Sequence, residues 1–478
     1  MPSTLNSSTL LKLTSTTNCQ DRLFMESPNL NFSFDDLHHL LQRVPRSSPQ
    51  FIGIIEETSP DFILAFLVAL MQGHDIFLLS KRHPHEQLET IISDAKLAYL
   101  VGPRTIENIN FSVDFIPFED LSEFKFGSTH LRPQNHIIFQ TSGSTQKSKY
   151  VVHTLDTLMA NAKGVVENSQ LCEDSRTLAI LPFNHVGGMG LLIRGLLTQS
   201  TLVFQDKDIS MLDTLIQSQI THVSFVPTQL RALLKSDFSI DDILNLTSVL
   251  VGGDRTDYSV VAEAKKRGLP IQLTYGLTEM ASQVTTTRLD ADDFEMNTSG
   301  QLLANTDMTI DHHGEILVRG ESLCLGYLNP TQRNNLIDPR DDDGWFHSGD
   351  LGYINHKSQL IVTGRIHNII ISGGENIQAE EIETSLMQIE GVDECYVIGT
   401  PNNEFGERPI AFIRKSNDII IAESFVRHSL KLKHPFFMIP DAFFLFPPEL
   451  ENTGIKTSRN NLKEFYLNHS SSLLKAFS

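Results

Sequence analysis

The sequence predicts an α/β protein with a large N-terminal domain of helix-covered, mostly parallel sheets, a small β-rich subdomain and a small α+β C-terminal domain. Short apolar segments rich in β-branched residues alternate with helical patterns over most of the chain before residue 300. Alternation of this kind is typical of parallel sheets covered by helices. Later in the chain, turn-rich strand segments replace the alternation, and we expect a β-rich subdomain followed by a compact α+β unit.

The elements follow one another in a regular order after residues 1–30, which are predicted to form a loose N-terminal extension. No internal repeat or low-complexity tract interrupts them. The predicted strands are 51–55, 75–79, 98–101, 136–139, 177–181, 201–204, 222–226, 248–251 and 271–274. The predicted helices between them are 61–71, 86–94, 228–235 and 258–267.

A domain boundary is predicted near Gly364 and Arg365, so the N-terminal domain spans residues 1–364 and the C-terminal domain residues 365–478. Residues 314–318 and 359–362 are predicted strands of the β-rich subdomain. Beyond the boundary, a strand, a glycine-rich turn, a helix at 379–388 and further strands indicate a separate α+β unit.

The charge balance excludes a general nucleic-acid or anionic-membrane surface. Lys and Arg total 38 and Asp and Glu total 58, which gives a formal net charge of −20. An acidic protein that binds anionic substrates must gather positive charge or backbone N–H groups locally.

The cysteine pattern and the apolar segments favour a cytoplasmic protein without stable membrane insertion. Four cysteines are scattered without a C-x-x-C pair or metal-ligand spacing, which indicates incidental thiols in a reducing compartment. The N-terminus lacks the basic and apolar regions of a signal peptide. The longest apolar run, residues 62–71, is too short to span a bilayer.

A hydroxyl-rich loop at residues 141–149 follows a predicted strand and carries the strongest chemical signal. Its sequence is Thr-Ser-Gly-Ser-Thr-Gln-Lys-Ser-Lys. Small residues around a glycine leave backbone N–H groups free to face phosphate oxygens, and the lysines supply charge. Taken alone, the loop could equally be a polar surface turn. It does not fit a Walker A loop, because Ser148 stands where the second glycine belongs.

Four further segments follow in order. Residues 274–279 read Thr-Tyr-Gly-Leu-Thr-Glu, and residues 347–352 read His-Ser-Gly-Asp-Leu-Gly. Residues 364–377 join Gly-Arg to the run Ser-Gly-Gly-Glu-Asn-Ile, and residues 452–459 read Asn-Thr-Gly-Ile-Lys-Thr-Ser-Arg. Each segment alone could be a turn, a loop or a basic tail.

Together these five motifs, in this order, resemble the adenylate-forming superfamily of acyl-CoA synthetases, luciferases and peptide-synthetase adenylation domains. The resemblance implies ATP, Mg²⁺ and CoA as cofactor and co-substrates, an N-terminal domain that binds AMP and the acyl group, and a mobile C-terminal lid. The implied nucleotide and CoA contacts are Thr141, Ser142, Gly143, Ser144, Thr145, Lys149, Gly252, Gly253, Thr274, Tyr275, Gly276, Thr278, Asp350, Arg365, Gly373 and Gly374.

The resemblance also assigns roles to single side chains. Glu279 is the expected Mg²⁺ ligand, since a hard cation prefers carboxylate and phosphate oxygens. Asp350 is expected to accept hydrogen bonds from ribose. Lys456 is the expected catalytic lysine, which would stabilise charge developing at the reacting carboxylate and α-phosphate. His367 stands at the hinge, where the family usually has Asp or Lys.

The predicted acid-binding stretches are residues 181–188, Arg194, residues 251–254 and residues 280–283. These stretches resemble those of the o-succinylbenzoate–CoA ligases of menaquinone synthesis. An aromatic dicarboxylate needs an apolar slot for the ring and a donor for the carboxylate that does not react. The expected substrate contacts are His185, Arg194, Ser282 and Gln283, and His185 is also expected to take part in catalysis. His185 could instead be a satisfied core histidine, and Arg194 a surface arginine.

The expected reaction joins a small carboxylic acid, ATP and CoA into acyl-CoA, AMP and diphosphate through an acyl-adenylate. Three alternatives stay open: another aryl- or fatty-acyl–CoA ligase, an enzyme that loads a carrier protein, and a nucleotide-binding homologue that has lost turnover. The sequence also leaves open whether the chain forms a homo-oligomer.

Overall fold

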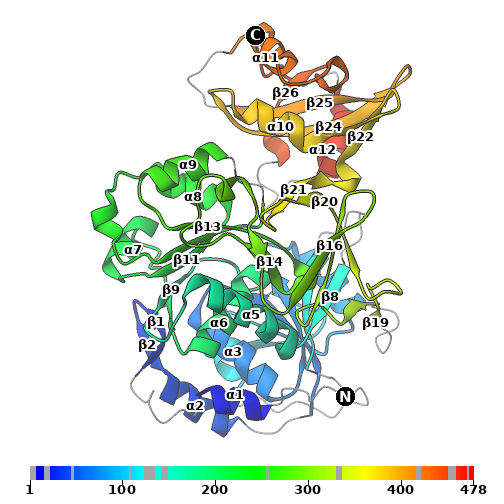
Figure 1. The fold of residues 1–478 in the computed structure, drawn as a ribbon. Coiled ribbons are helices and arrows are strands. Elements are labelled where there is room, and N and C mark those ends of the chain that lie inside the picture. Colours follow the sequence, from blue (N-terminus) through cyan, green and yellow to red (C-terminus); the bar gives the residue numbers. More distant parts are fainter. Residues whose placement is uncertain are drawn as a thin grey trace. The chain divides into compact units, whose positions relative to one another are not determined.

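The computed structural model describes residues 7–14, 22–44, 48–106, 109–122, 135–141, 149–254, 256, 258–329, 336–415, 421–450, 459–470 and 473–477. The chain divides into two compact units (Figure 1). The larger unit comprises Met1–Met308, Val318–His347 and Ser358–Leu360, and the smaller comprises Thr309–Leu317, Ser348–Lys357 and Ile361–Ser478. The domain boundary predicted between residues 364 and 365 stays a prediction.

The first sheet of the larger unit has nine strands in the order β15-β14-β13-β12-β11-β9-β10-β1-β2. Its central strands, from β13 to β1, are parallel, and antiparallel pairs form both edges. The strands are β1 (Leu23–Ser27), β2 (Leu30–Ser33), β9 (Arg176–Ala179), β10 (Thr201–Phe204), β11 (His222–Phe225), β12 (Ser248–Val251), β13 (Ile271–Leu277), β14 (Ser282–Thr286) and β15 (Gln301–Leu302).

The second sheet has eight strands in the order β19-β18-β8-β7-β4-β3-β5-β6. Its centre is parallel, and every residue of β3 is buried, as expected for a strand covered on both faces. The strands are β3 (Phe51–Glu56), β4 (Asp75–Ser80), β5 (Tyr99–Gly102), β6 (Asp114–Pro117), β7 (Ile137–Thr141), β8 (Lys149–His153), β18 (Gly326–Leu328) and β19 (Leu336–Ile337).

Helices cover these sheets, and the largest apolar core joins α3, α5 and α6 to strands of both sheets. Helix α3 begins after Ser59, whose hydroxyl accepts a hydrogen bond from the Phe62 N–H, and Pro60 occupies the first helical position. The helices of this unit are α1 (Ser7–Thr14), α2 (Phe34–Arg43), α3 (Pro60–Met71), α4 (His85–Asp94), α5 (Leu155–Ser169), α6 (Val186–Thr198), α7 (Met211–Gln217), α8 (Pro227–Leu234) and α9 (Tyr258–Lys266).

The prediction of a loose extension over residues 1–30 is wrong for its ordered part. Strand β1 pairs in parallel with β10 and joins the nine-stranded sheet. Phe24 and Met25 are fully buried, and Leu10 of α1 belongs to the same core. The hydroxyl-rich composition of the first residues concealed this short apolar strand.

A third sheet has the order β16-β17-β20-β21, and the division into two units falls within its strands. The smaller unit contains a five-stranded sheet in which β23, β22, β25 and β24 follow one another and β26 pairs with β25. The elements are β16 (Thr306–Ile310), β17 (Glu315–Gly320), β20 (Phe346–Ile354), β21 (Leu360–Arg365), β22 (Ile369–Ser372), β23 (Glu375–Gln378), β24 (Val392–Asn402), β25 (Gly406–Lys415), β26 (Phe443–Leu445), α10 (Ala379–Met387), α11 (Glu423–Lys431) and α12 (Arg459–His469).

The predicted fold class is confirmed: parallel-rich sheets under helices, an antiparallel sheet and a C-terminal α+β unit. In the described part of the chain, no helix combines the length and the apolar character needed to cross a membrane.

Candidate active site

The hairpin of β13 and β14 carries many of the predicted ATP-site and acid-site residues of the larger unit. A β-bulge lies between Tyr275 and Gly276. A Cβ atom at Gly276 would lie 1.8 Å from the main-chain oxygen of Ser282, so only glycine permits this approach of the two strands. The bulge and the close approach together fix the turn that presents Thr278 and Glu279.

Two residues where the turn enters β14 have unusual backbone conformations. Ala281 has φ +59° and Ser282 has φ +141°, a region that non-glycine residues rarely adopt. The buried amide of Asn161 on α5 donates to the carbonyls of Met280 (3.2 Å) and Gln283 (2.7 Å), on either side of these two residues. Helix α5 therefore holds the strained turn in place.

A second buried side chain, His153 at the end of β8, holds the same turn. Its Nε2 atom lies 2.8 Å from the carbonyl oxygen of Thr278, and its Nδ1 atom lies 2.9 Å from the hydroxyl of Thr157. Complete burial lowers the pKa of His153 to about 4, so the ring is neutral at pH 7. Since a carbonyl only accepts, the proton lies on Nε2 and donates to Thr278.

Glu279, the predicted Mg²⁺ ligand, is a half-buried carboxylate. The hydroxyl of Tyr327 on β18 donates to its Oε1 atom at 2.7 Å. Burial raises the pKa of Tyr327 and raises that of Cys324 to about 12, and the charge of Glu279 adds to both effects. The Nζ atom of Lys149 lies 4.8 Å from the centre of the Tyr327 ring.

The donor set at Glu279 fits a magnesium ion that is bound mainly through phosphate oxygens. Among the residues described, no cation forms an ion pair with this carboxylate, and no group of three or more His, Cys, Asp or Glu side chains could hold a metal by itself. A single carboxylate with free lone pairs is the protein contribution expected of such a site.

Two further predicted segments meet beside β13. Gly252 follows β12, and a Cβ atom there would lie 2.4 Å from Cγ2 of Thr274. The hydroxyl of Thr274 donates to the Thr285 carbonyl at 2.8 Å. Gly253 is exposed, and Tyr275 and Thr278 are half-buried on the hairpin. The structure therefore brings the Gly252 segment and the 274–279 motif together.

The predicted phosphate loop connects β7 and β8. Thr141 and Lys149 are directly opposite each other in this antiparallel pair, so the loop is closed by the two strands. Ser142, Gly143, Ser144 and Thr145 lie outside the residues that the structure describes. Thr141 is half-buried and Lys149 is exposed.

Arg194, a predicted acid-site residue, is buried within α6 with 4% of its surface exposed. No described residue forms an ion pair or accepts a hydrogen bond from its guanidinium, and burial lowers the pKa of Arg194 to about 10. A Cβ atom at Gly190 would lie 3.0 Å from its Nη1 atom, so the missing side chain one turn earlier leaves room for the guanidinium. A buried, unpaired cation of this kind is a ready site for an anion.

Two strands of the nine-stranded sheet, β9 and β14, carry buried polar atoms that have no hydrogen-bond partner in the described structure. His222 on β11 is paired in register with Thr177 on β9, and the charge of Arg194 contributes to lowering the pKa of His222, after burial. In the described structure, Oγ1 of Thr177 and Oε1 of Gln283 are buried without a hydrogen-bond partner. The predicted residue Gln283 thus has a free acceptor, and Thr177 has a hydroxyl available for a ligand.

His185 directly precedes α6 and is exposed. Desolvation of the ring by neighbouring protein atoms lowers the pKa of His185, and the positive charge of Arg82 lowers it further. The ring is therefore neutral at pH 7, with one nitrogen that can donate a hydrogen bond and one that can accept. The alternative of a satisfied core histidine does not match its exposure.

The smaller unit contains the remaining predicted residues. Asp350 is buried, and its Oδ1 atom pairs with Nε of Arg365 at 2.8 Å. His367, Gly373 and Gly374 are exposed. Lys456 lies outside the described residues, but Arg459, three positions later, starts α12.

Arg459 anchors this end of the smaller unit. Its guanidinium forms ion pairs with Glu380 at 3.3 Å and with the buried Glu383 at 2.6 Å. Both carboxylates lie on α10, so the C-terminal motif is tied to that helix beyond Lys456.

Sequence reasoning missed several residues that support the site, namely His153, Asn161 and Tyr327. Each acts through a partner more than 45 positions away in the chain. His153 stands in an otherwise apolar strand, and a buried polar residue there was the available signal. The sequence carries no such signal for Asn161 and Tyr327, because only the packing of α5 and β18 brings them to the turn.

Two parts of the chain match known protein families. Residues 39–328 match the AMP-binding enzyme family, and residues 381–456 match the AMP-binding enzyme C-terminal domain. The chain belongs to the AMP-binding enzyme family. It is an ATP-dependent acyl-CoA ligase, an enzyme of the AMP-forming acid–CoA ligase family. Enzymes of this family bind ATP with Mg²⁺ and use CoA as co-substrate.

Individual relatives span nearly the whole chain. The 2-succinylbenzoate–CoA ligase of Escherichia coli (strain K12) is 30% identical over 407 residues, which cover 85% of each chain. The o-succinylbenzoate CoA synthetase of Bacillus subtilis, solved with ATP and magnesium ion, superposes with a TM-score of 0.82 at 22% identity and covers 95% of this chain and 99% of its own.

The fold alone does not select the acid. ATP-bound MatB from Rhodopseudomonas palustris superposes equally well, with a TM-score of 0.83 at 22% identity, and covers 97% of this chain and 99% of its own.

Proposed function

We propose that the protein is a 2-succinylbenzoate–CoA ligase of menaquinone biosynthesis. It would convert o-succinylbenzoate, ATP and CoA into the CoA thioester, AMP and diphosphate through an acyl-adenylate. The likeness to 2-succinylbenzoate–CoA ligases over most of the chain supports this choice of acid. The single structural observation that carries it is the buried, unpaired guanidinium of Arg194.

A substrate with a second carboxylate explains why a charge is kept in the interior. Burying an arginine without a partner costs several kcal/mol unless an anion arrives to pair with it. A monocarboxylic acid has no second charge to offer, because its one carboxylate must react with ATP. The hydroxyl of Thr177, which is buried without a partner, would donate to the same carboxylate that pairs with Arg194.

Adenylate formation would take place at the hairpin of β13 and β14. Glu279 would hold Mg²⁺, which offsets the charge of the departing diphosphate when it is bound with ATP. Thr278 would contact the α-phosphate, while His153 and Asn161 keep the turn from moving. Tyr327 would hold one oxygen of Glu279 and leave the other available. Because the turn is set before the substrates bind, little reorganisation is needed in the transition state.

The smaller unit would serve the two steps in turn, with His367 at the hinge. Lys456 would donate to the reacting carboxylate and the α-phosphate during adenylate formation. Asp350 and Arg365 would separate from each other to bind ribose and phosphate. The Gly373–Gly374 turn would then line the path of the CoA thiol to the activated carbonyl, and closure would keep water away from the adenylate.

An Arg194→Met variant tests the substrate. Adenylate formation is followed by acid-dependent exchange of pyrophosphate into ATP with o-succinylbenzoate and, separately, with benzoate. We expect kcat/KM for o-succinylbenzoate to fall about 100-fold, since a hydrogen-bonded charge pair is worth about 2–3 kcal/mol, while benzoate changes less than about 3-fold. The unliganded variant should unfold at higher urea than wild type, because a buried unpaired charge has been removed.

Arg176→Met is the matched control, because Arg176 is a half-buried arginine that already pairs with Glu26 at 2.8 Å. It should leave the preference between the two acids unchanged. A wild type that prefers monocarboxylic acids would identify another acyl-CoA ligase. Transfer to a carrier protein but not to CoA would identify a loading enzyme, and no acid-dependent exchange would identify a nucleotide-binding homologue without turnover.

A further inference from the structure

The turn between β22 and β23 is a tight two-residue connection in the smaller unit. Ser372 and Glu375 are directly opposite each other in the antiparallel pair, which leaves Gly373 and Gly374 as the connection. Their φ angles are +61° and +88°, the two positive values that a type I′ turn requires. The hairpin itself is short, so its tip depends on contacts with neighbouring segments.

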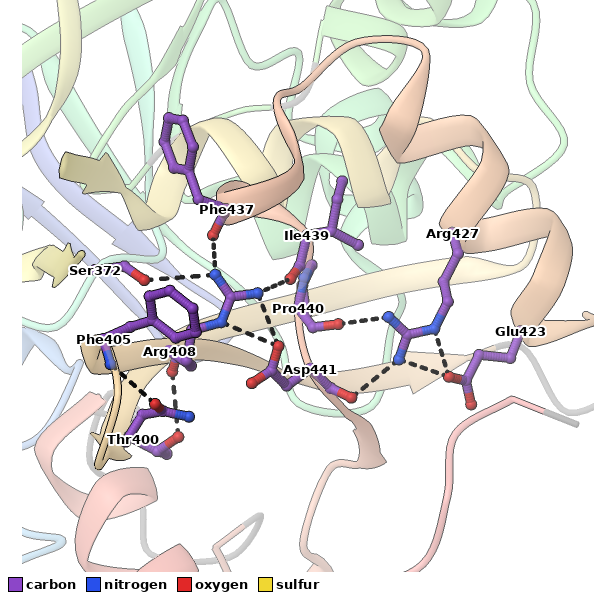
Figure 2. Close-up of polar contacts among 11 residues, drawn as sticks. Ser372, Thr400, Phe405, Arg408, Glu423, Arg427, Phe437, Ile439, Pro440 and Asp441 are labelled. Carbon is purple, nitrogen blue, oxygen red and sulfur yellow. Dashed lines mark hydrogen bonds and ion pairs between the residues drawn. The ribbon is translucent and has the colours of Figure 1, made fainter.

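Arg408 on β25 supplies such a contact through Ser372, the residue before the turn (Figure 2). The residue is buried, with 6% of its surface exposed. Its Nη1 atom donates to the carbonyl of Phe437 at 2.7 Å and to the hydroxyl of Ser372 at 3.4 Å. Its Nε and Nη2 atoms donate to Oδ1 of Asp441 at 3.1 and 2.8 Å, and Nη2 also donates to the carbonyl of Ile439 at 3.2 Å.

The strand that carries Arg408 also holds the turn directly. The N–H of Gly373 donates to the carbonyl of Phe405 at 2.7 Å, and Ser372 pairs with Gly406 at the start of β25. The guanidinium of Arg408 lies 5.7 Å from the centre of the Phe405 ring. One guanidinium therefore connects Ser372, the Phe405 segment and residues 437–441.

A planar fork is needed for this arrangement, and lysine could not replace it. The guanidinium satisfies two carbonyls, a carboxylate and a hydroxyl at once, whereas an ammonium group is a point donor on a flexible stem. Loss of the guanidinium would leave the carbonyls of Phe437 and Ile439 without this donor near the turn. The contacts with Ser372 and Phe405 would then no longer be fixed.

We propose that Arg408 is a positioning residue for thioester formation, a role that rests on the proposed function of the Gly373–Gly374 turn in guiding CoA. Arg408 touches neither ATP-site nor acid-site residues among those described. It acts through Ser372 and the Phe405 segment, which set where the glycine turn lies. Adenylate formation does not depend on this placement.

Arg427 provides a matched comparison in the same unit (Figure 2). Its guanidinium donates to the carbonyls of Pro440 (2.8 Å) and Asp441 (2.9 Å) and to Oε1 of Glu423 (2.7 Å). It thus braces the same 437–441 segment but makes no contact with Ser372 or Phe405. Loss of either arginine would loosen the smaller unit in general, whereas only loss of Arg408 would displace the glycine turn.

The test measures the two half-reactions separately in the full-length enzyme. Adenylate formation is followed by pyrophosphate–ATP exchange, and transfer by single-turnover reaction of preformed o-succinylbenzoyl-adenylate with CoA. For Arg408→Lys we expect transfer to slow at least 10-fold, with a raised KM for CoA, while exchange changes less than about 2-fold. Arg427→Lys should change each half-reaction less than about 2-fold.

Asp441→Asn is the second variant, in case Arg408→Lys does not fold. It keeps an acceptor for Arg408 but removes the charge, so transfer alone should slow about 3-fold. Equal losses in both half-reactions, unchanged transfer in Arg408→Lys or Asp441→Asn, or the same loss in Arg427→Lys would overturn the role of Arg408. A wild type that forms adenylate but does not transfer to CoA would instead overturn the proposed function, and the role of Arg408 with it.

Discussion

Two hairpin turns, one in each compact unit, are held in place by different chemistry. The turn after β13 is fixed by neutral, buried side chains, His153 and Asn161, that donate to main-chain carbonyls. The turn after β22 is braced by a charged guanidinium whose carboxylate partner, Asp441, has 47% of its side chain exposed. The first arrangement gives a rigid turn suited to a fixed site, and the second leaves the turn near the surface.

Each turn is therefore vulnerable to a different change. Neutral hydrogen bonds in a dry interior are insensitive to salt but fail when a buried ring must take up a proton. A partly exposed ion pair is weak by itself and acts mainly through geometry. Variants of the first turn should therefore damage adenylate formation and stability together. Variants of the second turn should slow transfer to CoA and leave adenylate formation nearly unchanged.

The largest expected effect is that of His153→Ala. It leaves the Thr278 carbonyl without its donor and opens a cavity beneath the turn that carries Glu279. We expect pyrophosphate–ATP exchange to fall at least 100-fold, with transfer from preformed adenylate much less affected.

His74→Ala is the control for this experiment. His74 is equally buried in the larger unit, and its Nδ1 atom accepts a hydrogen bond from the Gln50 N–H, remote in sequence from the turn. It should destabilise the unit while the folded enzyme keeps its exchange activity. Equal exchange activity in the two variants would mean that His153 does not position the turn.

The next effect is on stability at low pH. Burial lowers the pKa of both His153 and His74 from 6.5 to about 4. In the unfolded chain the two imidazole rings therefore bind protons below pH 6.5, whereas in the folded protein they bind them only near pH 4. The free energy of unfolding is therefore highest above pH 6.5, where both rings are neutral in the folded and unfolded states. It decreases as the pH falls towards 4, by on the order of 3 kcal/mol for each ring.

Urea unfolding at a series of pH values measures this loss. Trp345 is the one tryptophan of the sequence and lies in the larger unit, so its fluorescence reports on that unit. His153→Gln keeps a donor for Thr278 but cannot be protonated. Its stability should fall less steeply between pH 6.5 and 4 than that of wild type, and an identical slope would contradict the assignment.

The smallest effect is that of Ser282→Gly. Ser282 has φ +141°, which glycine adopts without strain, so the variant should gain about 1 kcal/mol in urea unfolding. If Ser282 donates to the acid, KM for o-succinylbenzoate should rise in the same variant. Ser358→Gly, at an exposed residue with φ +60°, should leave KM unchanged. A more stable Ser282→Gly enzyme with unchanged KM would remove Ser282 from the acid site.

The sequence was sufficient for much of the architecture, because buried parallel strands such as β3 are short apolar runs that need no tertiary information. It failed at β1, whose few buried residues follow a polar stretch. For the candidate site, the motifs predicted Glu279 and Arg194, since each lies in a recognisable segment. The sequence could not reveal that Arg194 is unpaired or that His153 and Arg408 support turns. Those properties arise from contacts between distant segments.

The proposed reaction is tested most directly by incubating the wild-type enzyme with o-succinylbenzoate, ATP, Mg²⁺ and CoA and identifying the products by mass spectrometry. We expect o-succinylbenzoyl-CoA and AMP in equal amounts, with no thioester when ATP is withheld. Absence of the thioester, with another carboxylic acid converted in its place, would contradict the proposed reaction.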